Sequence, residues 1–297
     1  LEIIWKFTKM MNRKPFDEVE RQKQLDLLGF WKNPMDENFL DMIKISVFPF
    51  YKLLSFTSLV VLADTTVFVF CMIYDQLDAS NGFLAPSQYT LFHLGYSDRI
   101  QMLNGQYYRF ITPIFIYQNF LHFFFSVFIK IYFLSFVEYI QGFLKTIFIY
   151  LLISTYGVIF NAVLTSRPAV GGSFCIGIIL ISLMQEHNIF QQTKNSNLYA
   201  FFSSSHESSV LPTIKLLFIL MIVYVANQVY PKIPIFGHCG SYLMGYLLTK
   251  FFAPEYPKEP QKNYIWLFLS LTLYIGTIIF LFLFLKDKDN NFEQMEG

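Results

Sequence analysis

The sequence contains few of the residues on which water-soluble enzymes and small secreted scaffolds depend. Charged residues make up 14% of its 297 residues, and there are three cysteines and five histidines. The cysteines lack the number and spacing of a disulfide framework, and no cysteine or histidine spacing predicts a metal site. The sequence also has no Asn-x-Ser/Thr motif and no internal repeat. A formal net charge of +1 gives no indication of a nucleic-acid partner.

Long apolar runs are abundant instead. Hydrophobic residues form 54% of the chain and aromatic residues 20%, which is typical of a polytopic membrane protein. A membrane-spanning helix needs about 20 predominantly apolar residues. Seven segments meet this need, at 54–74, 119–138, 144–164, 171–187, 211–229, 235–252 and 263–285. Glycines interrupt the sixth span, so we expect other helices to cover it. The predicted fold class is an all-α polytopic membrane protein.

The distribution of lysine and arginine predicts orientation and domain limits. Residues 1–53 carry nine of these cations, and the loops that share their side of the membrane carry further lysines. By the positive-inside rule, the N-terminus is predicted to be cytosolic and the C-terminus to lie outside. We therefore divide the chain into a cytosolic extension (1–53, with a helix expected at 16–29), a six-span core (54–252), and a linker with a seventh span and tail (253–297). The polar segment 188–210 is predicted to be a cytosolic loop.

Two short segments carry side chains suited to nucleophilic catalysis. Gly171-Gly172-Ser173 opens the fourth span, and His238 lies near the start of the sixth. A serine hydroxyl needs a neighbouring base to take its proton, and histidine has a suitable pKa. The predicted orientation places both at similar depth near the outer face. Taken alone, each is more commonly a capping or packing residue of a membrane helix.

Further polar residues accompany this pair. The segment from Gly105 to Phe115 includes Tyr108-Arg109, where we expect the arginine to lie near lipid headgroups. His122 lies at the outer end of the second span, and an ionisable residue there suggests a functional role. Lys130, in the middle of that span, has two interpretations: its side chain snorkels to the interface, or it pairs with Asp64 of the first span.

Several of these segments, in this order, resemble the rhomboid family of intramembrane serine proteases. The first similarity is the aromatic-arginine motif Gly105-Gln106-Tyr107-Tyr108-Arg109-Phe110 with Thr112. His122 matches the second-span histidine of the family, and Glu138 with Gly142 resembles its acidic residue and glycine. The Gly171-Gly172-Ser173 segment is similar to the nucleophile motif. His238 with Gly240, Ser241 and Gly245 resembles the sixth-span motif, and the additional last span is common among eukaryotic members.

This resemblance implies an activity and roles for the matched residues. Ser173 would be the nucleophile and His238 its general base, while His122 would bind the oxyanion. Ser126 and Gly171 would support the oxyanion site. The reaction would be peptide hydrolysis near the outer membrane face, in single-span substrates embedded in the same bilayer, with no cofactor. Ser241 and Gly245 form a small-xxx-small face that would let the sixth span approach the fourth, with Gly177 on the facing side.

Four residues differ from the family pattern. Phe174 replaces the glycine after the nucleophile, and Ser126 replaces an asparagine that usually supports the oxyanion. Gly177 stands where an aromatic residue commonly stacks on the catalytic histidine, and Ser241 stands where a glycine is usual.

Two other functional classes are open to a sequence of this kind. The first is a catalytically inactive rhomboid-like pseudoprotease that binds transmembrane clients in the secretory pathway. The second is a transporter or channel. The scarcity of charged residues in the spans argues against it, as does the lack of a pair of interrupted helices in two repeated halves. Because the extra span follows the core, the resemblance favours the secretory pathway or plasma membrane over the mitochondrion.

Overall fold

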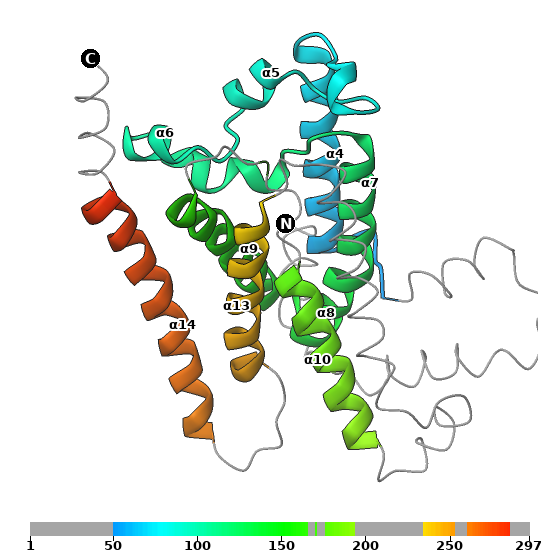
Figure 1. The fold of residues 1–297 in the computed structure, drawn as a ribbon. Helices are drawn as coiled ribbons and strands as arrows, with labels where there is room; N and C mark the ends of the chain where they lie inside the picture. Colours follow the sequence, from blue (N-terminus) through cyan, green and yellow to red (C-terminus); the bar gives the residue numbers. More distant parts are fainter. Residues whose placement is uncertain (1–49, 166–169, 171–175, 194–233, 253–259, 286–297) are drawn as a thin grey trace, which may run out of the picture.

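A computed structural model describes residues 50–165, 170, 176–193, 234–252 and 260–285. The described residues form a bundle of helices, and the backbone in these ranges forms no β-strand beyond one isolated bridge between Leu77 and Pro86 (Figure 1). The predicted fold class, an all-α polytopic membrane protein, is confirmed. The expected helix at 16–29 and the expected span at 211–229 lie outside the described residues.

Long helices account for six of the seven expected spans. They are α4 (Phe56–Tyr74), α7 (Phe120–Ile129) with its continuation into α8 (Ser135–Gln141), α9 (Phe143–Leu164), α10 (Ile176–Thr193), α13 (Ile235–Phe252) and α14 (Pro260–Phe280). Four of the helices in the described ranges are long and apolar enough to cross a membrane: Phe56–Tyr74, Phe120–Gln141, Phe143–Leu164 and Tyr264–Leu283. In α10, the shorter stretch Ile176–Gln185 is apolar.

One expected boundary is wrong. The segment 188–210 is predicted to be a loop, yet α10 continues to Thr193. Polar residues such as glutamine are good helix formers, so a helix can extend beyond its apolar stretch. The apolar length therefore marks the part of α10 suited to hydrocarbon, and it underestimates the helix.

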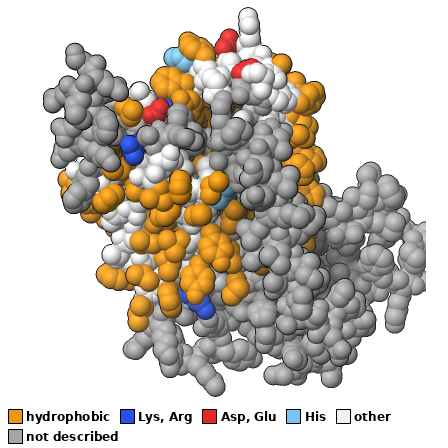
Figure 2. Space-filling view, in the orientation of Figure 1, with side chains coloured by type: hydrophobic (Ala, Val, Ile, Leu, Met, Phe, Trp, Pro, Cys, Tyr) orange, Lys and Arg blue, Asp and Glu red, His pale blue; other side chains and the backbone are white. Residues whose placement is uncertain are grey.

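The surface of the bundle agrees with a lipid environment. Figure 2 shows hydrophobic side chains over much of the flank of the bundle, whereas the charged side chains in view lie mainly toward its ends. Many large apolar side chains of the spans are exposed, including Leu62 of α4, Phe125 of α7 and Phe268 of α14. In water such exposure would be costly, whereas acyl chains of a bilayer cover these side chains without that cost.

The start of α4 is joined to the end of the second span by Glu138. The Glu138 carboxylate accepts hydrogen bonds from the backbone N–H groups of Phe56 and Thr57 at 2.7 and 2.9 Å. It also accepts a hydrogen bond from the Thr57 hydroxyl at 2.8 Å. The first N–H groups of a helix lack intrahelical partners and carry partial positive charge, so a carboxylate there stabilises the helix end. Four residues later, Gly142 has φ +81°, and the chain turns there into α9.

Helix α13 lies between three other helices, as its glycines predict. It contacts α9, α10 and α14. A Cβ on Gly240 would lie 2.5 Å from Cβ of Phe160 in α9. On the α10 side, a Cβ on Gly245 would lie 2.5 Å from Cα of Gly177, and a Cβ on Gly177 would lie 2.2 Å from the Ser241 carbonyl oxygen. The backbones of α10 and α13 therefore meet directly, without intervening side chains.

The last helix, α14, packs against α9 and against the segment that precedes α7. The Tyr274 hydroxyl donates a hydrogen bond to the Thr155 hydroxyl at 2.9 Å, which joins α14 to α9. Beyond α14, the π-helical segment Leu281–Leu285 places Phe282 edge-on to Tyr107 and Phe110. The seventh span is therefore attached to the core by polar as well as apolar contacts.

The contact between α10 and α13 predicts that a single methyl group is not tolerated there. We expect Gly245→Ala to lower the stability of the folded protein by about 1–3 kcal/mol, because overpacking forces the two backbones apart. The measurement is the thermal unfolding of purified protein in one detergent. Gly276→Ala in α14 is the matched control, because in the described ranges no atom beyond its own helix backbone lies within 4 Å of the added Cβ. Equal unfolding temperatures for the two variants would contradict the prediction.

Candidate active site

His122 lies in the first turn of α7 and is held by its own local backbone. Asn119 is the N-cap residue of α7, and its side-chain oxygen accepts a hydrogen bond from the His122 N–H at 2.9 Å. The imidazole is 8% exposed and lies edge-to-face on the ring of Tyr117, with 5.5 Å between ring centroids. The side chain is therefore confined by a cap on one side and an aromatic ring on another.

The two ring nitrogens of His122 have different environments. Nδ1 accepts a hydrogen bond from the Gln118 backbone N–H at 3.4 Å. A neutral imidazole has one acceptor and one donor nitrogen, so this bond assigns the proton to Nε2. Nε2 is buried and has no hydrogen-bond partner within the described part of the chain. The site thus presents a fixed N–H donor to a position where a substrate oxygen could lie.

His238 lies in the first turn of α13, where its backbone N–H donates to the Pro234 carbonyl at 3.1 Å. Its side chain is 5% exposed. It lies close enough to His122 for the two imidazoles to interact electrostatically. The structure thus brings together two histidines that are 116 residues apart in the sequence. One comes from the second span and the other from the glycine-interrupted span.

Ser173, Gly171 and Phe174 lie outside the described residues. The described residues on either side of that segment are Val170 and Ile176, the first residue of α10. There, the Gly177 backbone N–H donates to Oγ of Ser241 at 3.1 Å. Helix α10, which follows Ser173 directly, is therefore tied to α13 one turn beyond His238.

Ser126 lies one turn along α7 from His122, on the same helix face, and is buried. Gly240, Ser241 and Gly245 follow His238 on α13 and are also buried. Glu138 lies near the other end of the second span, in α8, where its carboxylate contacts the start of α4. The exposed thiol of Cys239 follows His238, and Cys71 is buried in α4. In the described ranges, no group of three His, Cys, Asp or Glu side chains could hold a metal ion.

The expectation that Arg109 lies near lipid headgroups is wrong. Its side chain is 1% exposed, and its guanidinium donates to the carbonyl oxygens of Tyr96 at 2.9 Å and Phe92 at 3.0 Å. Its Nε donates to Oε1 of Gln106 at 2.7 Å, and Tyr108 donates to the same oxygen. The segment before α7 forms short helices whose backbone carbonyls point inward, and a buried guanidinium satisfies several of them at once.

Arg109 organises the segment between α4 and α7, which includes α5 (Gln88–His93) and α6 (Arg99–Leu103). The guanidinium carbon lies 4.8 Å from the ring centroid of Phe92 and 5.5 Å from that of Tyr108. Burial raises the pKa of the Tyr96 hydroxyl, and the charge of Asp98 raises it further, while Arg109 acts in the opposite direction. The segment ends at Tyr117, Gln118 and Asn119, all of which contact His122.

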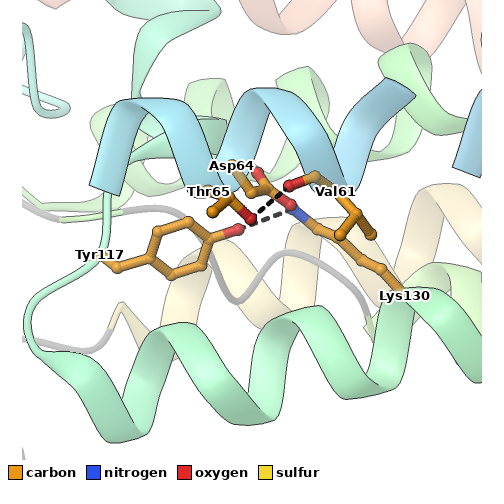
Figure 3. Close-up of polar contacts among 5 residues, drawn as sticks. All are labelled: Val61, Asp64, Thr65, Tyr117 and Lys130. Carbon is orange, nitrogen blue, oxygen red and sulfur yellow. Dashed lines mark hydrogen bonds and ion pairs between the residues drawn. The ribbon is translucent and has the colours of Figure 1, made fainter. Parts of the chain in front are cut away.

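A buried ion pair joins α4 to the second span. Nζ of Lys130 lies 2.8 Å from Oδ2 of Asp64 and donates to the Tyr117 hydroxyl at 2.8 Å (Figure 3). The two charged side chains are 1% and 0% exposed. Of the two interpretations of Lys130, pairing with Asp64 is therefore confirmed, and snorkelling is wrong. The lysine begins the π-helical segment Lys130–Leu134, which connects α7 to α8.

Comparison with known proteins identifies the fold. The family model described as the rhomboid domain matches residues 104–255, from the Arg109 segment to the end of α13. The chain belongs to the rhomboid family. No curated protein matches the sequence significantly. The match covers the histidines of α7 and α13, whereas α4 and α14 of this rhomboid lie outside it.

Some parts of the site in this rhomboid could not be found from sequence. None of the motifs described above includes Tyr117, Gln118 or Asn119, which hold His122. The sequence also gives no indication of the hydrogen bond from the Gly177 N–H to Oγ of Ser241. The contact between Asp64 and Lys130 did have a signal in the sequence, namely two opposite charges in the first two spans, because unpaired charges at membrane depth are costly.

The geometry of Arg109 predicts that lysine cannot replace it. We expect Arg109→Lys to destabilise this rhomboid by at least about 2 kcal/mol, because one ammonium cannot reach acceptors that lie around a planar fork. Thermal unfolding in detergent measures the effect. Arg99→Lys, in the first turn of α6 and only partly buried, is the control. A stability loss no larger than that of Arg99→Lys would contradict the proposed role of the fork.

Proposed function

We propose that this rhomboid is an intramembrane serine endopeptidase in which Ser173 is the nucleophile and His238 the general base. The observation that carries the proposal is the arrangement of the two histidines. His122 presents a buried Nε2–H with no partner in the described ranges, and His238 lies within electrostatic range of it. Helix α10, which follows Ser173, is tied to α13 through Gly177 and Ser241.

The chemistry assigns one task to each side chain. His238 takes the proton from Oγ of Ser173 as that oxygen attacks the carbonyl carbon of the scissile bond. The carbonyl oxygen gains negative charge and is stabilised by the Nε2–H of His122. His238 then gives the proton to the leaving amine. In the second half of the reaction, His238 activates a water molecule that hydrolyses the acyl-enzyme and restores Ser173.

A donor such as His122 is effective because it is already in place before the reaction. Its ring is confined by Tyr117 and Gln118, so it does not have to reorient when charge develops on the substrate oxygen. Ser126, buried one turn away, and the backbone at Gly171 are proposed to complete the oxyanion site. No carboxylate is assigned to orient His238, so the dyad relies on helix packing for its geometry.

The substrate class follows from the location of the site. The first turns of α7 and α13 contain the two histidines, so we infer that cleavage takes place near one face of the membrane. The distribution of lysine and arginine supports the outer face for this site and a cytosolic location for the N-terminus. The substrates are then single-span transmembrane proteins that reach the site through the bilayer. A secretory or plasma membrane is the proposed location.

Loss of either dyad residue should abolish activity. We expect Ser173→Ala and His238→Ala to eliminate cleavage of transmembrane model substrates in proteoliposomes, and Ser173→Ala to eliminate labelling by a serine-directed fluorophosphonate. Ser182→Ala, at a buried serine of α10, and His93→Ala, at an exposed histidine, are matched controls that should retain activity. Native protein that neither cleaves nor labels would instead favour the client-binding pseudoprotease.

His122 should affect the rate of the reaction more than substrate binding. We expect His122→Ala to lower kcat by about 100- to 1,000-fold, which is the effect of removing one oxyanion donor in a serine protease. KM should stay close to that of native protein, because the lost interaction forms fully only in the transition state. Single-substrate kinetics in proteoliposomes measure both constants. A rise in KM with unchanged kcat would show that His122 binds substrate and does not stabilise the oxyanion.

A further inference from the structure

A second group of buried polar side chains lies behind His122, and the proposed mechanism does not use it. Asp64 of α4, Lys130 of the second span and Tyr117 of the connecting segment meet through two contacts of 2.8 Å (Figure 3). All three are almost completely buried. A fully buried ion pair is costly to form in a membrane, so its presence calls for an explanation beyond general stability.

Tyr117 connects this group to His122. Its hydroxyl accepts a hydrogen bond from Lys130, and its ring lies edge-to-face against the His122 ring at 5.5 Å. The next residue, Gln118, supplies the backbone N–H that donates to Nδ1 of His122. Anything that fixes Tyr117 therefore fixes both the ring packed on His122 and the peptide that holds its Nδ1.

The backbone around Lys130 is also unusual. The second span changes from α-helix to π-helix at this residue, in the segment Lys130–Leu134. Single π-helical turns within α-helices are rare and frequently occur at functional sites. Nζ of Lys130 lies 5.5 Å from the ring centroid of Tyr117 and 5.6 Å from that of Tyr150. The ammonium is thus enclosed by two aromatic rings, with Asp64 as its counter-ion.

We propose that Asp64, Lys130 and Tyr117 are positioning residues for His122. The ion pair holds the Tyr117 hydroxyl, and Tyr117 in turn holds the Gln118 N–H on Nδ1. This bond keeps the imidazole proton on Nε2, the nitrogen that is buried without a protein partner in the described ranges. The inference rests on the proposed function only for the role of Nε2–H toward substrate. The coupling of Tyr117 to the tautomer of His122 is a property of the resting protein.

The proposal makes a specific statement about the imidazole. With the Gln118 N–H in place, a proton on Nδ1 would point at another proton, so one tautomer is strongly favoured. When Tyr117 loses its anchor, the peptide can move away from Nδ1 and the second tautomer becomes accessible. The ring then presents an acceptor to the oxyanion for part of the time, and catalysis by that fraction is lost.

The test uses a conservative substitution and a matched control. Tyr117→Phe removes the hydroxyl that Lys130 holds and keeps the ring. Tyr150→Phe removes a hydroxyl from the other tyrosine around the same ammonium, and Tyr150 makes no ring contact with His122 in the described part of the chain. Asp64→Leu combined with Lys130→Met removes both charges together, so that neither is left buried and unpaired. All three are made in the full chain.

The readout is the ¹⁵N spectrum of histidine-labelled protein in lipid bilayers. The chain has five histidines, and the His122 signals are identified by their loss in His122→Gln. Native protein should show His122 as a single tautomer with the proton on Nε2. Tyr117→Phe and the double variant should show a mixture of tautomers, whereas Tyr150→Phe should match native protein. An unchanged tautomer in both Tyr117→Phe and the double variant would overturn the proposal.

Kinetics on the same proteins separate this proposal from the proposed function. If the dyad cleaves substrates, Tyr117→Phe should lower kcat by less than the about 100-fold expected for complete loss of an oxyanion donor, with KM unchanged. If native protein shows no cleavage, the proposed function fails, while a tautomer that responds to Tyr117→Phe still supports the positioning role. A fall in kcat with no change of tautomer would contradict it.

Discussion

The bilayer interior offers no water to polar groups, and the arrangement of this rhomboid follows from that constraint. Several of its buried polar groups join different segments of the bundle. Lys130 is paired with Asp64, Glu138 accepts hydrogen bonds from the start of α4, and Gly177 donates to Ser241. Each pair fixes the relative position of two segments. Nε2 of His122 is among the buried polar atoms that have no hydrogen-bond partner in the described ranges. A donor left unpaired in such an environment is costly, and a substrate oxygen would satisfy it.

Close approach of helices is the second requirement, because the proposed dyad would be assembled from two spans whose backbones nearly touch. Gly177 and Gly245 provide this contact, and Ser241 adds a hydrogen bond at the same place. In the family pattern a glycine is usual at the position of Ser241. Here the serine is small enough to keep the approach, and its Oγ accepts the N–H of a residue in the first turn of α10. One of the departures from the family pattern thus adds a bond between the two helices.

The sequence was a good guide to the spans because their signal is strong and local. About 20 apolar residues are needed for each, and six expected spans correspond to described helices. The fold class is confirmed because it follows from these apolar runs. The family is confirmed by the match to the rhomboid domain, which includes the histidine motifs of the second and sixth spans. The prediction for Arg109 failed because an arginine among aromatic residues has the same local pattern whether it faces headgroups or carbonyl oxygens. Only the folded segment shows that Phe92 and Tyr96 direct their carbonyls at it. The roles of Ser173, His238 and His122 stay predictions, since sequence similarity assigns residues to positions and not to rates.

The ion pair of Asp64 and Lys130 shows why a membrane protein would keep charges that an apolar core could replace. For stability alone, two well-packed apolar side chains serve as well as a buried ion pair, and often better. An ion pair differs in being directional: Lys130 has to meet both the Asp64 carboxylate and the Tyr117 hydroxyl, which fixes the register of α4 against the second span. Apolar contacts tolerate sliding, whereas hydrogen bonds of 2.8 Å do not. His122 lies two turns along the same span from Lys130, so the register that the lysine fixes is also the register of His122. For the proposed dyad, whose nucleophile and base would come from separate helices, this directional contact supplies a positional accuracy that lipid-exposed apolar packing alone does not provide.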